Sequence, residues 1–202
     1  MKKLSVDPKD EKYFIEKYRL DEVMDNATLR KNIALTLQYI HFNLDLIRTY
    51  GLKKNLKALT CKQLLISTFS VLEGIMLGAT ETIKTWCDSM GSCQSDCKFY
   101  FKKDLSKPIR FNVIKKYIHD INAHRFTEHR GVEFIKIAKD LRNNVHIGKS
   151  SEIESENEYY TVEFVEESLN AIFQASLVLG SFIFKQKSEF YQPAIKMCPR
   201  CN

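Results

Sequence analysis

A regular apolar stripe between residues 27 and 51 constrains the fold of this chain more than any other feature. Its members follow one another at steps of four and three residues: Leu29, Ile33, Leu37, Ile40, Leu44 and Ile47. That spacing places all of them on one side of an α-helix. Asn26 precedes the stripe and is a residue type that caps helix starts, whereas Gly51 is a type that ends helices. We therefore expect a helix from Ala27 to about Gly51 that packs against other helices.

Similar spacing recurs along the rest of the chain. A second long helix is expected from near Thr60, with an apolar side formed by Leu65, Phe69, Leu72, Met76, Ala79, Ile83 and Trp86. A loop is expected over 87–108, followed by helices near 111–121, from 132 to Gly148, and from about Thr161 to Lys187. With only 7 Gly and 4 Pro in 202 residues, the chain has few sites for the turns of an all-β fold. The sequence therefore predicts an all-α antiparallel bundle of four to five long helices.

Three regions follow from this pattern: an N-terminal arm with a short helix (1–26), the helical bundle (27–187) and a C-terminal tail (188–202). Residues 168–184 carry no charge, but serines and amides interrupt the run and it is short for a membrane span, so a buried core helix is expected. The first residues lack the apolar core of a secretory signal, which favours a cytoplasmic protein without a membrane anchor. The net charge of +6 is spread along the chain and is compatible with a polyanionic partner.

The polar segment Arg142-Asn143-Asn144-Val145-His146 is the strongest candidate for chemistry. Arg142 and His146 are four positions apart, so on a helix they would lie on the same side, one turn apart. A guanidinium can hold a phosphate through two donors, and a histidine can transfer a proton near neutral pH. Asn143 could orient a substrate or the imidazole. These groups would suit RNA cleavage by its own 2′-hydroxyl, a route that needs no metal.

The same segment also has a purely structural interpretation. A cation in the last turn of a helix interacts favourably with the helix dipole, and Asn and Gly are ordinary residues at helix ends. The chemistry of the segment alone favours a helix terminus over a catalytic site.

The chain resembles the HEPN superfamily of helical domains (higher eukaryotes and prokaryotes nucleotide-binding) over roughly residues 30–187. Three segments carry the resemblance: residues 70–74 (SVLEG), 111–115 (FNVIK) and 138–146 (AKDLRNNVH). The family's signature is an Arg, commonly followed by Asn, and then a His a few residues later. Arg142, Asn143 and His146 occupy those places here.

Many HEPN proteins are metal-independent ribonucleases, often toxins or defence effectors, in which two Arg–His motifs of a dimer form one cleft. The resemblance thus implies catalysis by Arg142, Asn143 and His146, RNA as substrate, a homodimer, no required cofactor and a neutralising protein partner. The signature usually has four to six residues between Arg and His, and this chain has three. Some relatives are non-catalytic RNA-binding or protein-interaction domains, which is the alternative function. Glu73 fits either the polar cleft or a hydrogen bond between helices.

The six cysteines raise the question of a metal site. Cys198 and Cys201 have the spacing of half a zinc knuckle. The other ligands would come from a second protomer or from Cys87, Cys93 and Cys97. The alternative is a tail with two free thiols. The histidines other than His146 are expected to be ordinary residues: His41 on the first long helix, and His119, His124 and His129 at the surface. Phosphate contacts are the alternative role for His119, His124 and His129.

Overall fold

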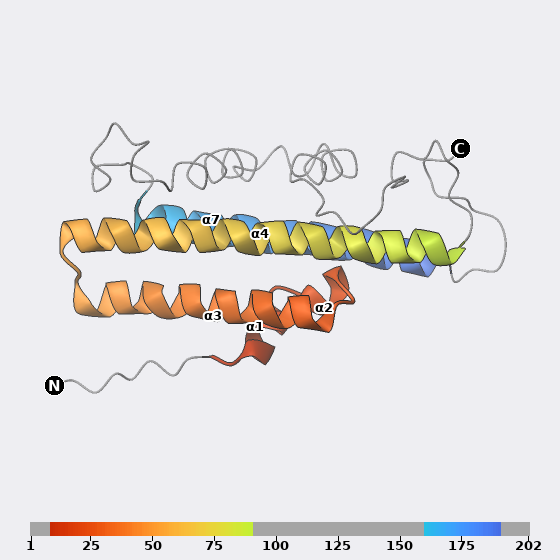
Figure 1. Cartoon of the computed structure of the whole chain (residues 1–202), viewed down its shortest axis with the longest axis horizontal. Helices are drawn as coiled ribbons and strands as arrows, with labels where there is room; N and C mark the ends of the chain where they lie inside the picture. Colours follow the sequence, from red (N-terminus) through yellow and green to blue (C-terminus); the bar gives the residue numbers. More distant parts are fainter. Residues whose placement is uncertain (1–8, 91–159, 191–202) are drawn as a thin grey trace.

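The computed structural model describes residues 9–90 and 160–190, and these two ranges contain α-helices and no strand. In chain order, the helices are α1 (Glu11–Lys17), α2 (Leu20–Val23), α3 (Ala27–Tyr50), α4 (Lys54–Met90) and α7 (Val162–Phe190) (Figure 1). They pack against one another, so the predicted all-α bundle is confirmed for this part of the chain. The helices expected near 111–121 and 132–148, and the tail 188–202 beyond Phe190, lie outside the described residues.

The long helix α4 packs against both α3 and α7; in Figure 1 it lies above α3, with α7 behind it. α3 and α4 are joined by a short turn and run antiparallel, as expected. α7 runs in the same direction as α4. Lys62, near the start of α4, lies over the ring of Tyr160, just before α7, and Gly78 and Gly180, further along the two helices, both approach α2. The three long helices thus enclose one core.

The two ends of α3 agree with the sequence prediction. The Asn26 side chain accepts a hydrogen bond from the Leu29 N–H at 3.0 Å, which caps the first turn. At the other end Gly51 has a φ of 56°, a left-handed conformation that glycine adopts without steric cost. The predicted apolar stripe faces the core, where all its members are buried except the half-buried Leu29.

Two predicted boundaries were wrong, both in α4. The helix begins at Lys54 rather than near Thr60, and it continues to Met90, into the segment 87–108 that was predicted to be a loop. Lysines in a first turn are unfavourable for the helix dipole, which makes this start hard to recognise in the sequence. Packing explains the extra turns at the start, because Ala58 and Cys61 are buried. For α7 the expected start is confirmed, since the Thr161 hydroxyl accepts from the Phe164 N–H at 3.1 Å.

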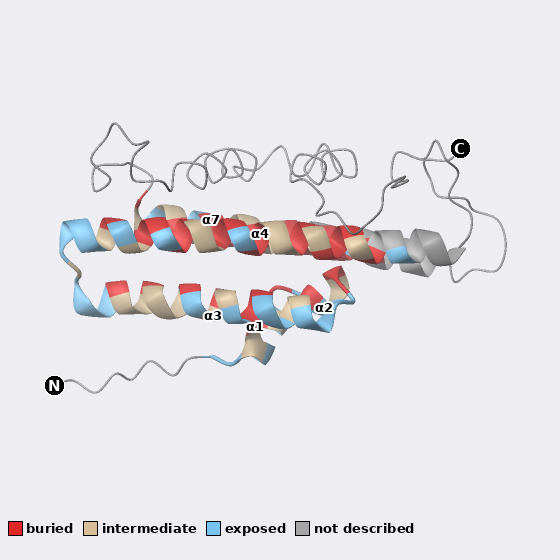
Figure 2. Cartoon of the chain, viewed as in Figure 1, coloured by how far each residue is buried: buried red, intermediate tan, exposed pale blue. Residues whose placement is uncertain are grey.

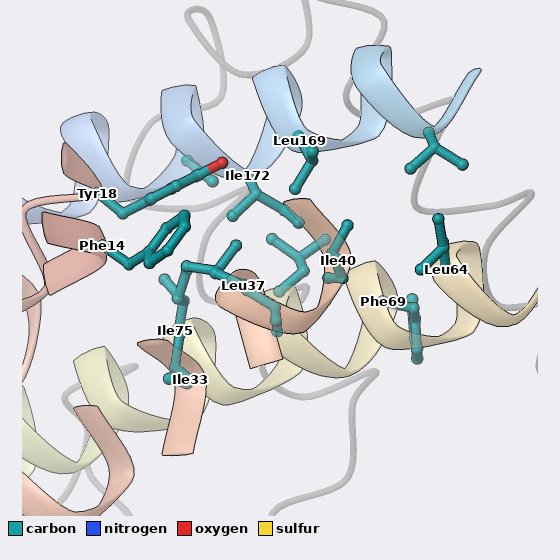
Figure 3. Close-up of a cluster of buried hydrophobic side chains, with 14 of the residues drawn as sticks. Phe14, Tyr18, Ile33, Leu37, Ile40, Leu64, Phe69, Ile75, Leu169 and Ile172 are labelled. Carbon is teal, nitrogen blue, oxygen red and sulfur yellow. The ribbon is translucent and has the colours of Figure 1, made fainter. Parts of the chain in front are cut away.

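The polar-looking N-terminal segment contributes to the core. Phe14 of α1, Tyr18 and Leu20 are nearly inaccessible to solvent, and so are Val23 and Met24 at the end of α2. Figure 3 shows Phe14 and Tyr18 beside Leu37, Ile40 and Ile172, which come from α3 and α7. Charged residues of α1, such as Lys12 and Glu16, face outward. α1 and α2 therefore close one side of the three-helix core rather than hanging free from it.

Two glycines allow α2 to approach the long helices closely. A Cβ atom at Gly78 of α4 would lie 2.8 Å from the Met24 Sδ and 2.9 Å from the Met24 Cβ. A Cβ atom at Gly180 of α7 would lie 3.3 Å from the Glu22 Cβ. Beside this contact, the Asp25 N–H donates to the Thr82 Oγ1 at 3.0 Å, and Arg30 donates to the Met24 carbonyl at 2.8 Å.

Most of the core-facing surface of α4 is buried against its neighbours (Figure 2). Among the described residues, the stretch from Lys54 to Thr82 is long and apolar enough to cross a membrane by length and composition. More than half of it is buried inside the bundle, as in the core helix of many soluble proteins. Its composition alone is weak evidence for a membrane span.

Candidate functional site

The residues predicted to carry chemistry fall outside the described part of the chain. Arg142, Asn143 and His146 lie in the range 91–159, and Cys198 and Cys201 follow residue 190. Glu73, which was expected either in the polar cleft or in a hydrogen bond between helices, is half-buried on α4.

Within the described residues, a part-buried hydrogen bond joins the side chains of Tyr18 and His41. Tyr18 follows α1 and is 1% exposed, and its Oη lies 3.2 Å from the Nε2 of His41 on α3. The two groups share a hydrogen bond whose donor depends on the histidine tautomer. Aromatic rings surround the pair: Phe14 lies 5.2 Å from the His41 ring centroid, and Phe173 of α7 meets the Tyr18 ring edge-on at 6.1 Å.

The apolar surroundings shift both groups away from titration at neutral pH. Burial, reinforced by the positive charge of Lys17, lowers the pKa of His41 to about 4, with Asp45 acting weakly in the opposite direction. Burial also raises the pKa of Tyr18 well above its ordinary value. Both shifts favour the neutral form of the group, as expected where a charge would lose its hydration.

This pair is consequently suited to holding α1 against α3 and unsuited to acid–base catalysis at neutral pH. A catalytic acid or base works best when its pKa lies near the working pH, and neither group meets that condition. The hydrogen bond instead satisfies two polar groups in an apolar environment, where leaving them unpaired would be costly. His41 is thus more than the ordinary helix residue expected from the sequence: its ring packs under α1.

Near the start of α4 lie a buried lysine and a buried thiol. Lys62 is only 6% exposed, and its Nζ lies 5.9 Å from the centroid of the Tyr160 ring. Burial raises the pKa of the neighbouring Cys61 thiol, which opposes formation of the reactive thiolate. In residues 9–90 and 160–190, no group of three or more His, Cys, Asp and Glu side chains could hold a metal ion.

An ion-pair group connects α3 to α7 on the surface. Arg48 contacts Asp45 of its own helix at 3.2 Å and also pairs with Glu166 of α7. All three side chains are roughly half exposed, so the group aligns the helix ends and is poorly suited to enclosing a substrate.

Comparison with known proteins identifies no relative. No family model, no curated protein and no solved structure matches the chain.

Proposed function

We propose that this chain is an HEPN-like, metal-independent endoribonuclease of the toxin or defence type that works in the cytoplasm as a homodimer. The observation that carries the proposal is the segment Arg142-Asn143-Asn144-Val145-His146, with its Arg, Asn and His in the order of the family signature. The all-α bundle supports it, because the resemblance implies a helical fold. The excess of basic residues, net charge +6, suits an RNA substrate.

In the proposed reaction, the 2′-oxygen of a ribose forms a bond to the adjacent phosphorus, and the bond from phosphorus to the 5′-oxygen breaks. His146 accepts the proton of the 2′-hydroxyl, and the partner subunit's His146 donates a proton to the departing 5′-oxygen. Arg142 stabilises the charge that gathers on the phosphoryl oxygens. Asn143 orients the substrate or the imidazole. The products are a 2′,3′-cyclic phosphate and a 5′-hydroxyl, and no metal takes part.

The test is cleavage of a labelled RNA by the purified chain in EDTA. Arg142→Ala and His146→Ala should each lower the rate by at least about 100-fold, a typical value for one acid–base or electrostatic group. Arg130→Ala and His129→Ala are matched controls, since they remove the same side chains from a segment without the signature. Equal rates in the four variants, or no cleavage by the wild type, would refute the enzymatic function.

The short interval between Arg142 and His146 favours a second candidate, a non-catalytic RNA-binding or protein-interaction domain of the same fold. An RNA-binding domain would show an affinity that falls steeply with salt, because each phosphate contact releases counterions. It would leave the RNA intact in EDTA. Inserting one residue after Asn144 restores the usual interval, and a gain of cleavage in that variant would identify the short spacing as the cause of inactivity.

Zinc at Cys198 and Cys201 would be structural in either case. Metal analysis of the purified chain, compared with the Cys198→Ser and Cys201→Ser variants, tests it directly. Zinc in the wild type that is lost in both variants is the expected result for a bound metal.

A further inference from the structure

Helix α1 is held to the bundle mainly through α3. The Phe14 ring lies 5.2 Å from the ring of His41 on α3, and the Gln38 amide of α3 donates to the Lys9 carbonyl at 2.8 Å. With only seven residues, α1 is too short to be stable as an isolated helix. It therefore depends on these contacts to stay folded. We refer to residues 9–18, which include α1, as the strap.

Arg19 separates the strap from α2 and has a left-handed backbone, with a φ of 50° and a ψ of 39°. This conformation is unfavourable for a residue with a side chain, and movement of the strap would relieve it. On the other side of Arg19, α2 is fixed by separate contacts. Met24 packs closely against Gly78 of α4, and the Asp25 N–H donates to the Thr82 Oγ1 at 3.0 Å. Arg19 is thus a hinge at which the strap can move while α2 stays in place.

His41 lies at the centre of the contact between the strap and α3. Its Nε2 lies 3.2 Å from the Tyr18 Oη, and its ring is packed against Phe14. On the α7 side, the apolar ring of Phe173 covers Tyr18. Four charged residues act on the imidazole, three of them positive: Lys9, Lys17, Arg48 and Asp45. A protonated His41 would therefore be a poorly hydrated cation facing more positive than negative charge.

We propose that the strap is acid-sensitive: when His41 takes up a proton, the strap separates from α3 about Arg19, while α2 and the three long helices stay packed. Separation returns water to the imidazolium, whose burial without a counter-charge is costly. It also moves the ring away from Lys9 and Lys17 of the strap. Opening exposes Phe14 and Tyr18, which are nearly inaccessible in the closed form. The proposal does not depend on RNA cleavage.

The direction of the effect follows from the two states of His41. While the strap is closed, burial and the charge of Lys17 lower the pKa of His41 to about 4, whereas a free imidazole has a pKa of about 6.5. The open form binds the proton more readily, so opening is favoured as the pH falls from about 6.5 to about 4. Because solvent partly screens the half-buried ring, we expect the opening equilibrium to rise by at least about tenfold.

Hydrogen exchange of the full chain from pH 6.5 to pH 4, corrected for the intrinsic effect of pH, tests the proposal. The amides of α1 should lose protection at least about tenfold, while those at the centres of α3 and α7 keep theirs. In His41→Gln the side chain stays neutral and can still pair with the Tyr18 hydroxyl, so this loss should disappear. The variant also measures any share of the exposed Glu11–Lys31 pair, which joins α1 to α3 as well. Circular dichroism establishes that it is folded.

Three results would overturn the proposal. The amides of α1 and of the centre of α3 could lose protection together, which would mean that the bundle opens as one unit. The protection of α1 could stay the same from pH 6.5 to pH 4. The loss in His41→Gln could equal that in the wild type, which would assign the effect to another group.

Two lysine variants of α1 test the role of charge without changing His41. Lys17→Gln removes the cation that acts most strongly on the imidazole, so the rise in opening between pH 6.5 and pH 4 should be smaller than in the wild type. Lys12→Gln is the matched control, because Lys12 lies on the same helix, is 79% exposed and pairs with Glu16. It should leave the rise unchanged. An unchanged rise in Lys17→Gln, or equal effects of the two substitutions, would also overturn the proposal.

Discussion

The substitution Gly78→Ala tests the close contact between α2 and α4. In an exposed helix interior, replacing Gly with Ala stabilises by about 1 kcal/mol, because Ala has the higher helix propensity. At Gly78, however, the new Cβ would lie 2.8 Å from the Met24 Sδ and 2.9 Å from the Met24 Cβ. A rotamer change can move the sulfur but not the Cβ, which is attached to the backbone of α2. The clash therefore requires a shift of the helix.

The two effects oppose each other, and the clash should be the larger. Overpacking of a dense core typically costs about 1–3 kcal/mol, so the net loss in the free energy of unfolding should be about 1–2 kcal/mol after the gain in propensity. Urea denaturation of the wild type and the variant measures it. Gly180→Ala is the control, because its Cβ would meet the Glu22 Cβ at 3.3 Å and the flexible Glu22 Oε2 at 3.4 Å, both beyond a hard clash. It should be neutral or slightly stabilising.

A double-mutant cycle isolates the cause. Met24 is fully buried, so Met24→Gly, which removes the Cβ together with the sulfur, should alone destabilise by at least about 2–5 kcal/mol through the cavity it leaves. In that background the methyl group introduced by Gly78→Ala fills vacated space, and the substitution should become stabilising. The sign of the Gly78→Ala effect must therefore reverse between the two backgrounds. The same destabilisation in both would refute the steric explanation.

Three further predictions concern the contacts of α3. Lowering the pH from about 6.5 to about 4 should destabilise the fold through His41, because the unfolded chain binds the proton more readily than the folded one. The loss in the free energy of unfolding should be on the order of 1–2 kcal/mol, since solvent partly screens the half-buried ring. His41→Gln should flatten that part of the stability curve, and an unchanged slope would contradict the assignment. Asn26→Ala removes the cap of α3 and should cost about 1 kcal/mol in urea denaturation, against a few tenths for Asn26→Gly. Arg48→Ala should lower the free energy of unfolding by no more than about 1 kcal/mol, because the ion pairs of Arg48 with Asp45 and Glu166 are half exposed. The loss should shrink in 1 M salt, whereas a large, salt-independent loss would show that Arg48 acts through packing.

Local signals explain which parts of the fold could be predicted. α3 was predicted from Asn26 to Gly51 because its caps and its core-facing stripe are all short-range features of the sequence. The start of α4 was missed because Lys53 and Lys54 resemble a polar connection, and only the burial of residues further along explains why the helix begins there. Tertiary packing, which a single sequence does not reveal, determined that boundary.

The N-terminal segment was harder to interpret for a related reason. Its apolar residues are interrupted by Lys, Glu, Arg and Asp. In addition, α1 has only seven residues, which are too few to show a clear helical period. Its role becomes visible only where Phe14 and Tyr18 meet residues far along the chain, including Phe173.

The state of His41 bears on how the proposed ribonuclease activity should be interpreted. The chain has five histidines, and a pH profile of cleavage would normally leave all of them as candidates. Burial lowers the pKa of His41 to about 4, so this ring remains neutral from about pH 5 to pH 8 and contributes no ionisation there. A bell-shaped profile centred near neutral pH would therefore report other groups. If the profile keeps its shape in His41→Gln and loses a limb in His146→Ala, the titrating group is His146.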